Sequence, residues 1–170
     1  MPELKLRYFS KREAREVSEA ISRALGRELT PLAELSSGKV AVVVTREGAL
    51  LLRVPGSNAY VPALVDADSV SRVRGYVVVD EGAIRHVVNG ANIMRPGIVE
   101  YSEFGRDEVV VVREGTYRKP IAVGIALVAS EELRGMSRGQ VVRNVHHLRD
   151  EAWELLRDEE TQRFINKLIK

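Results

Sequence analysis

The sequence contains no cysteine in its 170 residues. This absence excludes a disulfide framework, a thiolate nucleophile and a cysteine-based zinc site. The Gly-x-Gly-x-x-Gly loop, the Walker phosphate loop and the Gly-x-Ser-x-Gly nucleophile elbow are also missing. Nucleotide-driven and serine-hydrolase enzymes depend on these motifs, so both kinds of chemistry lack their usual parts here, and we expect no cofactor.

Long hydrophobic runs are missing too. The longest nearly unbroken apolar run extends from Ile121 to Ala129, which is far short of the ~20 residues that a membrane-spanning helix needs. The N-terminus has no signal-peptide core, so we expect a cytoplasmic location and no membrane partner. The hydrophobic share of 45% is sufficient for a packed core in one large or two small domains.

Neither sign of charge dominates, since 26 Lys and Arg residues oppose 24 Asp and Glu residues. The net charge of +2 therefore does not by itself indicate nucleic-acid binding. The cations are unusual in kind, because six are lysine and 20 are arginine. Arginine is better suited than lysine to bidentate phosphate contact and base stacking. Codon bias or a hot-growing source would produce the same preference, so both interpretations stay open.

Residues 1–72 are predicted to form a small N-terminal α/β domain. A capping box begins at Ser10, and apolar residues then recur at helical spacing. Two apolar runs over 39–45 and 49–54 are typical of a β-hairpin, and an extended segment over 60–65 follows.

After Arg74 the sequence changes to short β-rich segments separated by turns. The strand candidates are Val77 to Val79, Ile98 to Tyr101, Glu108 to Val112, Pro120 to Ala129 and Val141 to Leu148. Their spacing suits a pseudo-β-barrel over residues 73–153. Apolar residues from Trp153 onward predict a terminal helix, with a C-terminal helical extension over 154–170. The predicted fold class is therefore α+β.

The helix predicted after Asp80 leads into a loop bounded by two glycines. Its buried members are expected to be Ile84, Val87 and Val88, and its outward members Arg85, His86 and Asn89. Gly90 is expected to end the helix in the left-handed conformation, and Gly97 beside Pro96 permits a tight turn. Such a loop lets backbone approach a ligand closely, although glycines at these positions can equally serve only to turn the chain.

Two motifs in this half carry a family resemblance. Residues 90–97 read Gly-Ala-Asn-Ile-Met-Arg-Pro-Gly, and residues 144–153 read Asn-Val-His-His-Leu-Arg-Asp-Glu-Ala-Trp. In this order they resemble the PUA domain of the malignant T-cell-amplified sequence family, relatives of the initiation factor ligatin. The resemblance covers residues 4–153 and points to an archaeal-type member, with a segment at 60–64 similar to the family's Tyr-Pro-Thr-Leu. Many eukaryotic relatives have cysteine where this chain has Arg95, and the helix over 154–170 extends past the family's usual end.

PUA domains are RNA-binding modules that use the helix-to-strand loop and the last strand as their RNA-facing surface. The RNA-binding residues that the resemblance implies are Arg85, Asn89, Gly90, Ala91, Asn92, Arg95, Pro96, Gly97, Arg143 and His146. It further implies a non-catalytic protein that binds tRNA or small-subunit rRNA on the ribosome during initiation, reinitiation or recycling. The N-terminal domain would then bind a translation-factor partner chain or a second RNA site.

Several alternatives stay open. The protein could be the specificity subunit of a tRNA- or rRNA-modifying enzyme of the pseudouridine synthase or transglycosylase type, or an adaptor whose barrel has lost RNA binding. His146 and His147 suggest a metal site, but adjacent strand residues point to opposite faces, so we expect no metal. Trp153 could stack on a base, although its apolar helical position favours a role in the core.

Overall fold

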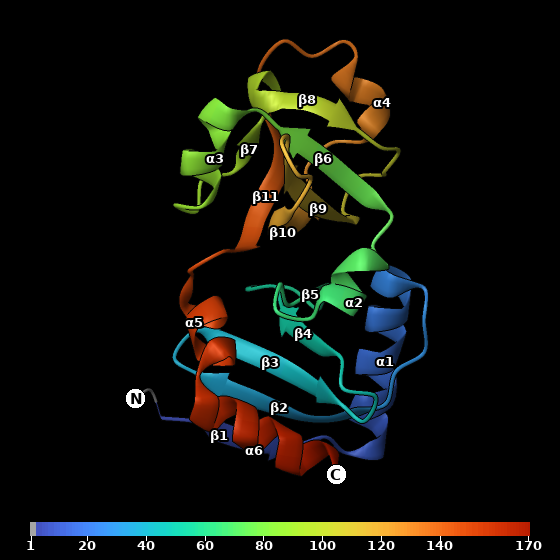
Figure 1. The fold of residues 1–170 in the computed structure, drawn as a ribbon. Coiled ribbons are helices and arrows are strands. Elements are labelled where there is room, and N and C mark those ends of the chain that lie inside the picture. Colours follow the sequence, from blue (N-terminus) through green and yellow to red (C-terminus); the bar gives the residue numbers. More distant parts are fainter. Residues whose placement is uncertain (1–2) are drawn as a thin grey trace.

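The computed structural model describes residues 3–170, which form two β-sheets, one above the other in Figure 1. The first sheet contains, in spatial order, β1 (Lys5–Tyr8), β2 (Pro31–Ser37), β3 (Val40–Thr45), β4 (Leu50–Arg53) and β5 (Tyr60–Pro62). Each strand pairs antiparallel with its neighbour. Helix α1 (Lys11–Leu25) packs on this sheet, and α2 (Ala67–Ser71) leads to the second sheet.

The second sheet curls into the predicted pseudo-barrel. Its strands are β6 (Gly75–Val79), β7 (Ile93–Met94), β8 (Ile98–Tyr101), β9 (Val109–Glu114), β10 (Pro120–Ala126) and β11 (Gln140–His147). Their spatial order is β7-β11-β10-β9-β6-β8, with β6 and β9 parallel. The short η1 helix (Arg95–Gly97) joins β7 to β8, which are the two edge strands, so the edges of the sheet must approach each other. Helices α3 (Glu81–Val87) and α4 (Ser130–Leu133) lie between its strands in the sequence. The second sheet with α3 and α4 is called the second half below, and the first sheet with the helices packed on it is called the first half. The α+β fold class is thereby confirmed.

Helix α1 begins where the sequence predicts. The Glu13 backbone N–H donates to the Ser10 hydroxyl at 3.1 Å, and the Ser10 N–H donates to the Glu13 carboxylate at 3.2 Å. Gly26 ends the helix with φ of 64°, a conformation that glycine adopts without steric cost. Val17 and Ile21 point into the core of the first half, which is the reason that this amphipathic helix covers the sheet.

Strands β1 and β2 were not predicted. Strand β2 alternates buried and half-buried positions, but its outward residues include Glu34 and Ser36, so its apolar density is low. Strand β2 forms because it is hydrogen-bonded on one side to β3 and on the other side to β1. Pairing between strands, rather than local propensity, therefore decides this part of the first sheet.

The C-terminal segment forms two helices instead of the single predicted one. Helix α5 (Glu151–Arg157) ends at Asp158, whose backbone is extended, and α6 (Glu159–Ile169) begins there. The Asp158 carboxylate accepts the Thr161 N–H at 3.0 Å and so caps α6. No helix within residues 3–170 combines the length and apolar character that crossing a bilayer requires.

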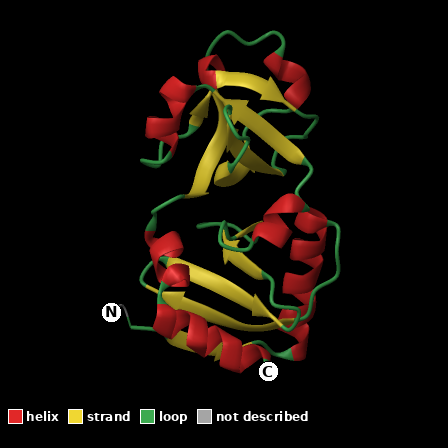
Figure 2. Ribbon diagram, viewed as in Figure 1, coloured by secondary structure: helices red, strands yellow, loops and turns green. Residues whose placement is uncertain are grey.

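Both C-terminal helices return to the first half of the molecule. Leu156 and Ile165 are buried in the same core cluster as Ile21 and Leu35. Figure 2 shows helices on two sides of the lower sheet, α1 on one side and the C-terminal helices on the other. The segment 154–170 is thus packed on the first half, although the predicted boundaries at 72/73 and 153/154 stay predictions.

Candidate nucleic-acid interface

The loop between α3 and β8 lies on the surface of the second half. Asp80 caps α3 by accepting the Ala83 N–H at 2.9 Å, and the predicted outward residues Arg85 and Asn89 are exposed. Gly90 has φ of 96°, which a residue with a Cβ rarely adopts. The loop that follows is exposed at Ala91 and Met94. Figure 1 shows α3 and β7 away from the first sheet, so the first half does not cover this loop.

Two asparagines hold the backbone of this loop against β11. The Asn92 carboxamide oxygen accepts the Asn144 N–H at 2.9 Å, and its NH₂ donates to Gln140 at 3.1 Å. The Asn144 NH₂ donates in turn to the carbonyls of Val87 and Ala91, both at 2.9 Å. The loop is therefore fixed before any ligand arrives, which lowers the entropy that binding must overcome.

An open groove of about 530 Å³ runs beside the loop. Its lining includes Ala83, His86, Met94, Pro96 and Gly97. A Cβ added to Gly97 would lie 3.0 Å from the Ala83 Cβ, so glycine lets η1 approach α3. The groove presents apolar surface and backbone rather than a row of charges, which suits contact with bases or ribose more than with phosphates.

Arg95 is not the free cation that the sequence suggested. Its Nε donates to the Leu133 carbonyl at 2.8 Å, and one terminal nitrogen donates to the Ile98 carbonyl at 3.2 Å. The guanidinium also lies 5.6 Å from the centre of the Tyr101 ring. Arg95 therefore joins α4 to β8, and only its remaining donors are available for a ligand. Its role in RNA contact stays a prediction.

His146 was predicted on the RNA-facing surface, and its position contradicts this. The side chain is 1% exposed. Its Nε2 accepts the Leu64 N–H at 3.0 Å, and its Nδ1 bonds the Asp150 carboxylate at 2.8 Å. Burial raises the pKa of Asp150, but the bonds from His146 and nearby backbone N–H groups outweigh this and lower that pKa below its usual value. His146 thus connects the last strand to the first half.

The neighbouring His147 points the other way. Its ring lies 3.4 Å from the position that a Cβ on Gly90 would occupy. Successive strand residues alternate between faces, so a contact with the loop at 147 requires the opposite direction at 146. Arg143 also lies at the junction of the halves, since its guanidinium donates to the Pro55 carbonyl at 3.2 Å.

Two arginines that the sequence analysis missed flank the loop. Arg134 follows Leu133 and Arg138 precedes Gly139, and the carbonyls of Leu133 and Gly139 both accept hydrogen bonds from Arg95. Within residues 3–170, neither arginine nor Arg85 forms a side-chain hydrogen bond or an ion pair, and all three are exposed. The glycines in Arg134-Gly-Met-Ser-Arg138-Gly were the available sequence signal for a second surface loop.

The comparison with protein families agrees with this arrangement, because residues 75–148 match the PUA domain family. The second half is a PUA domain. An uncharacterized protein of Methanocaldococcus jannaschii is 42% identical over 81 residues, which are 47% of this chain and 50% of that protein. Translation machinery-associated protein 20 of Schizosaccharomyces pombe is 32% identical over 94 residues, or 52% of this chain and 50% of that protein. The aligned region thus spans about half the length of these relatives.

Homology also reaches the malignant T-cell-amplified sequence proteins, as the motifs predicted. Malignant T-cell-amplified sequence 2 of Homo sapiens is 26% identical over 117 residues, covering 66% of this chain and 65% of that protein. Among solved structures, the PUA domain protein of Aeropyrum pernix, a tartrate complex, has a TM-score of 0.73 at 29% identity, with 92% of each chain covered. A hypothetical protein of Pyrococcus horikoshii has a TM-score of 0.71 at 27% identity, covering 88% of this chain and 98% of that chain. Both halves of the fold are therefore shared with these archaeal proteins.

Metal-ligating side chains do not gather in this half. Across residues 3–170, no three His, Cys, Asp or Glu side chains converge in a way that would hold an ion. The surface around the loop thus offers backbone, amide and guanidinium groups.

Proposed function

We propose that this protein is a non-catalytic RNA-binding protein of the translation apparatus, and that the loop between α3 and β8 holds structured RNA. The observation that carries the proposal is a surface loop, fixed by Asn92 and Asn144, beside three arginines whose side chains have no partner within residues 3–170. Single-stranded ends and ribose edges can enter a glycine-bounded loop closely, while guanidinium groups neutralise the adjacent phosphates.

The RNA we propose is tRNA or small-subunit rRNA, bound in the cytoplasm during initiation, reinitiation or recycling. Homology to translation machinery-associated protein 20 and the PUA domain support this assignment. The first half has its own five-stranded sheet, although its core cluster also takes in Val111 and Val123 of the second sheet, and we propose that it contacts a translation-factor partner or another part of the ribosome.

Fluorescence anisotropy with labelled tRNA and with purified small ribosomal subunits tests the proposal. The loop variant Arg85→Gln/Arg134→Gln/Arg138→Gln should bind more weakly, and the slope of log Kd against log salt should fall by about 2, since each lost phosphate contact removes about 0.7–0.9. Arg95 is left unchanged, because its replacement would disturb the fold through its two backbone contacts.

The matched control is Arg15→Gln/Arg46→Gln/Arg163→Gln. These arginines are also exposed and have no side-chain partner within residues 3–170, but they lie on α1, after β3 and on α6. The control removes the same charge and should keep the slope of the unmodified protein. No saturable, salt-sensitive binding by the unmodified protein would show the proposed function to be wrong. If the loop variant and the control lost the same tRNA affinity, the RNA-binding surface would have to lie outside the loop.

A further inference from the structure

A second concave surface lies between the two halves, on the side of α1 and α2. This groove has a volume of about 670 Å³. Its walls come from four stretches of chain, namely the last turns of α1, residues 57–60, the link over 72–75 and residues 106–109. None of these stretches belongs to the loop described above. The two PUA motifs at 90–97 and 144–153 do not include them either.

Four arginines line this groove, namely Arg23, Arg72, Arg74 and Arg106. They come from α1, from the link between the halves and from the turn before β9. Arg23, Arg74 and Arg106 are exposed, and within residues 3–170 none has a carboxylate within 4.0 Å or a side-chain hydrogen bond. Guanidinium groups that share a concave surface without direct ion pairs create a positive potential there, which attracts anions.

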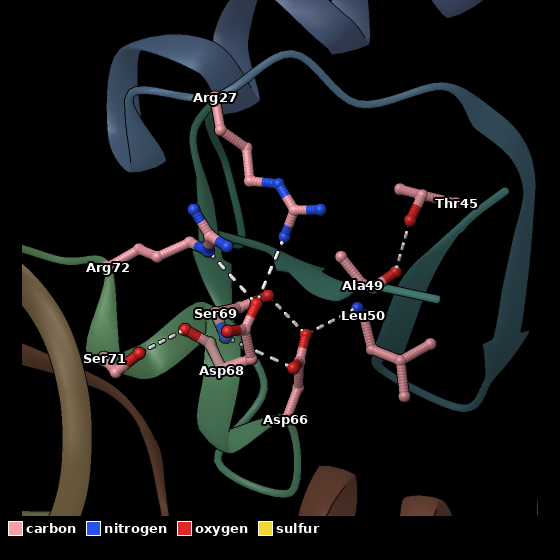
Figure 3. A network of polar contacts seen from close by, with 9 residues as sticks. All are labelled: Arg27, Thr45, Ala49, Leu50, Asp66, Asp68, Ser69, Ser71 and Arg72. Atoms are coloured by element: carbon pink, nitrogen blue, oxygen red, sulfur yellow. Dashed lines mark hydrogen bonds and ion pairs between the residues drawn. The ribbon is translucent and has the colours of Figure 1, made fainter. Parts of the chain in front are cut away.

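The fourth arginine is held in place by the network in Figure 3. Asp68 accepts from the Arg72 Nε at 3.0 Å and from Arg27 at 3.2 Å. Asp66 caps α2 and accepts the Leu50 N–H at 3.0 Å, which fixes α2 to β4. The single Nε contact leaves the terminal nitrogens of Arg72 free to donate. The link that carries Arg72 and Arg74 is therefore rigid.

The floor of the groove is also tightly packed. A Cβ on Gly75 would lie 3.0 Å from the Val109 carbonyl oxygen and 3.2 Å from the Phe104 Cβ. A residue with a Cβ at this position would force the link or β9 to shift by a few tenths of an ångström. The link that carries Arg72 and Arg74 is thus held against α2 and β9, which reduces the ordering cost of binding a ligand there.

Two carboxylates face the same groove and reduce its charge. Asp107 and Glu108 lie in the lining, but within residues 3–170 neither forms an ion pair with the arginines. Four guanidinium groups against two carboxylates leave a net positive lining. The remaining lining contains apolar residues such as Ala24, Val73 and Ile125. A free phosphate ion would leave this apolar surface uncovered, whereas a nucleotide chain covers it with ribose and base edges.

We propose that this groove between the halves binds the sugar–phosphate backbone of a second segment of the RNA that the PUA loop holds. The proposal rests on the proposed function, because it extends the same RNA across both halves. Arg23, Arg74 and Arg106 contact successive phosphates, with Arg72 as a fixed fourth donor. Arginine forks match the geometry of phosphate oxygens and bind them bidentately.

The test compares three triple variants with the unmodified protein by anisotropy with labelled tRNA over a range of salt concentrations. They are the groove variant Arg23→Gln/Arg74→Gln/Arg106→Gln, the loop variant and the control Arg15→Gln/Arg46→Gln/Arg163→Gln. The groove variant should lower the slope of log Kd against log salt by about 2 and weaken binding about ten- to a hundredfold at ~0.1 M salt. Its melting temperature should equal that of the control, because the replaced side chains have no partners within residues 3–170.

The outcomes separate the two proposals. Absence of tRNA binding by the unmodified protein refutes both. Binding with the same slope in the groove variant as in the control refutes the groove alone and leaves the loop proposal standing. Loss in the groove variant with no loss in the loop variant refutes the loop and, with it, the proposal that one RNA occupies both surfaces. Calorimetry with inorganic phosphate tests whether the groove binds a small anion instead of RNA. Saturable phosphate binding to the groove, together with an unchanged slope of log Kd for tRNA against log salt in the groove variant, would overturn the RNA assignment.

Discussion

Replacing His146 by alanine should loosen the junction between the two halves. The imidazole is buried and makes two contacts of different kinds, one to the Leu64 backbone and one to the Asp150 carboxylate. Alanine leaves the Leu64 N–H without an acceptor, which costs about 1–3 kcal/mol. It also removes a charge-assisted bond of about 1.5–3 kcal/mol and leaves a cavity. Because these effects overlap, we expect a total loss of about 3–5 kcal/mol.

Two further variants make this prediction specific. His146→Gln places a carboxamide oxygen where Nε2 was, so it should keep the Leu64 bond and lose about half as much stability as alanine. His86→Ala changes an exposed histidine on α3 and should alter stability by no more than about 0.5 kcal/mol.

Urea unfolding measures these differences, and the single tryptophan supplies the signal. Trp153 lies on α5 next to the junction, and its backbone N–H donates to the Asp150 carboxylate at 2.8 Å. Trp153 fluorescence and far-ultraviolet circular dichroism should give coincident transitions in the unmodified protein. A loss of less than about 1 kcal/mol for His146→Ala would refute the reasoning, because a buried histidine with two partners cannot be that dispensable.

Three more predictions concern acid stability and the loop. Because the pKa of Asp150 is lowered in the folded protein, its carboxylate stabilises the fold above its unfolded pKa of about 4, and this stabilisation is lost as the pH falls through the folded pKa. The urea midpoint of the unmodified protein should therefore decrease below about pH 4. The decrease should be smaller in Asp150→Asn, which has no carboxylate at this position. Asn144→Ala removes the donors to two carbonyls and should lower the free energy of unfolding by about 1–3 kcal/mol, with faster amide hydrogen exchange over residues 90–97. Unchanged exchange would mean that the asparagines do not fix the loop. Gly97→Ala should lower the free energy of unfolding by about 1–3 kcal/mol and weaken tRNA binding. Adding Ala83→Gly to the same chain should restore part of both losses. No recovery would show that the close approach to Ala83 is unimportant.

Local signals in the sequence were sufficient for the elements that depend on local interactions. The capping box at Ser10 located α1, and Gly90 located the turn that follows α3, although the helix itself ends at Val87. The two motifs also identified the PUA half, which the family comparison confirms. Strands β1 and β2 could not be predicted in the same way, because their pairing partners rather than their own residues decide their conformation.

Side-chain roles were harder to predict than elements. The adjacent histidines at 146 and 147 must point to opposite faces, but the sequence does not say which of them faces the other half. The Arg95 side chain donates to the carbonyl of Leu133, which is 38 residues away in the sequence. Arg134 and Arg138 reach the loop only because β11 pairs with β7. These roles depend on contacts between segments far apart along the chain.

The placement of RNA on the loop between α3 and β8 is tested most directly by nuclear magnetic resonance. In a titration with tRNA, the backbone amide signals of residues 85–97 and 134–139 should shift, while those of β1 and β2 should stay in place. Gly90 and Gly97 are useful reporters because their amides lie at the two ends of the loop. Shifts confined to the first sheet, with none at these two glycines, would contradict the account.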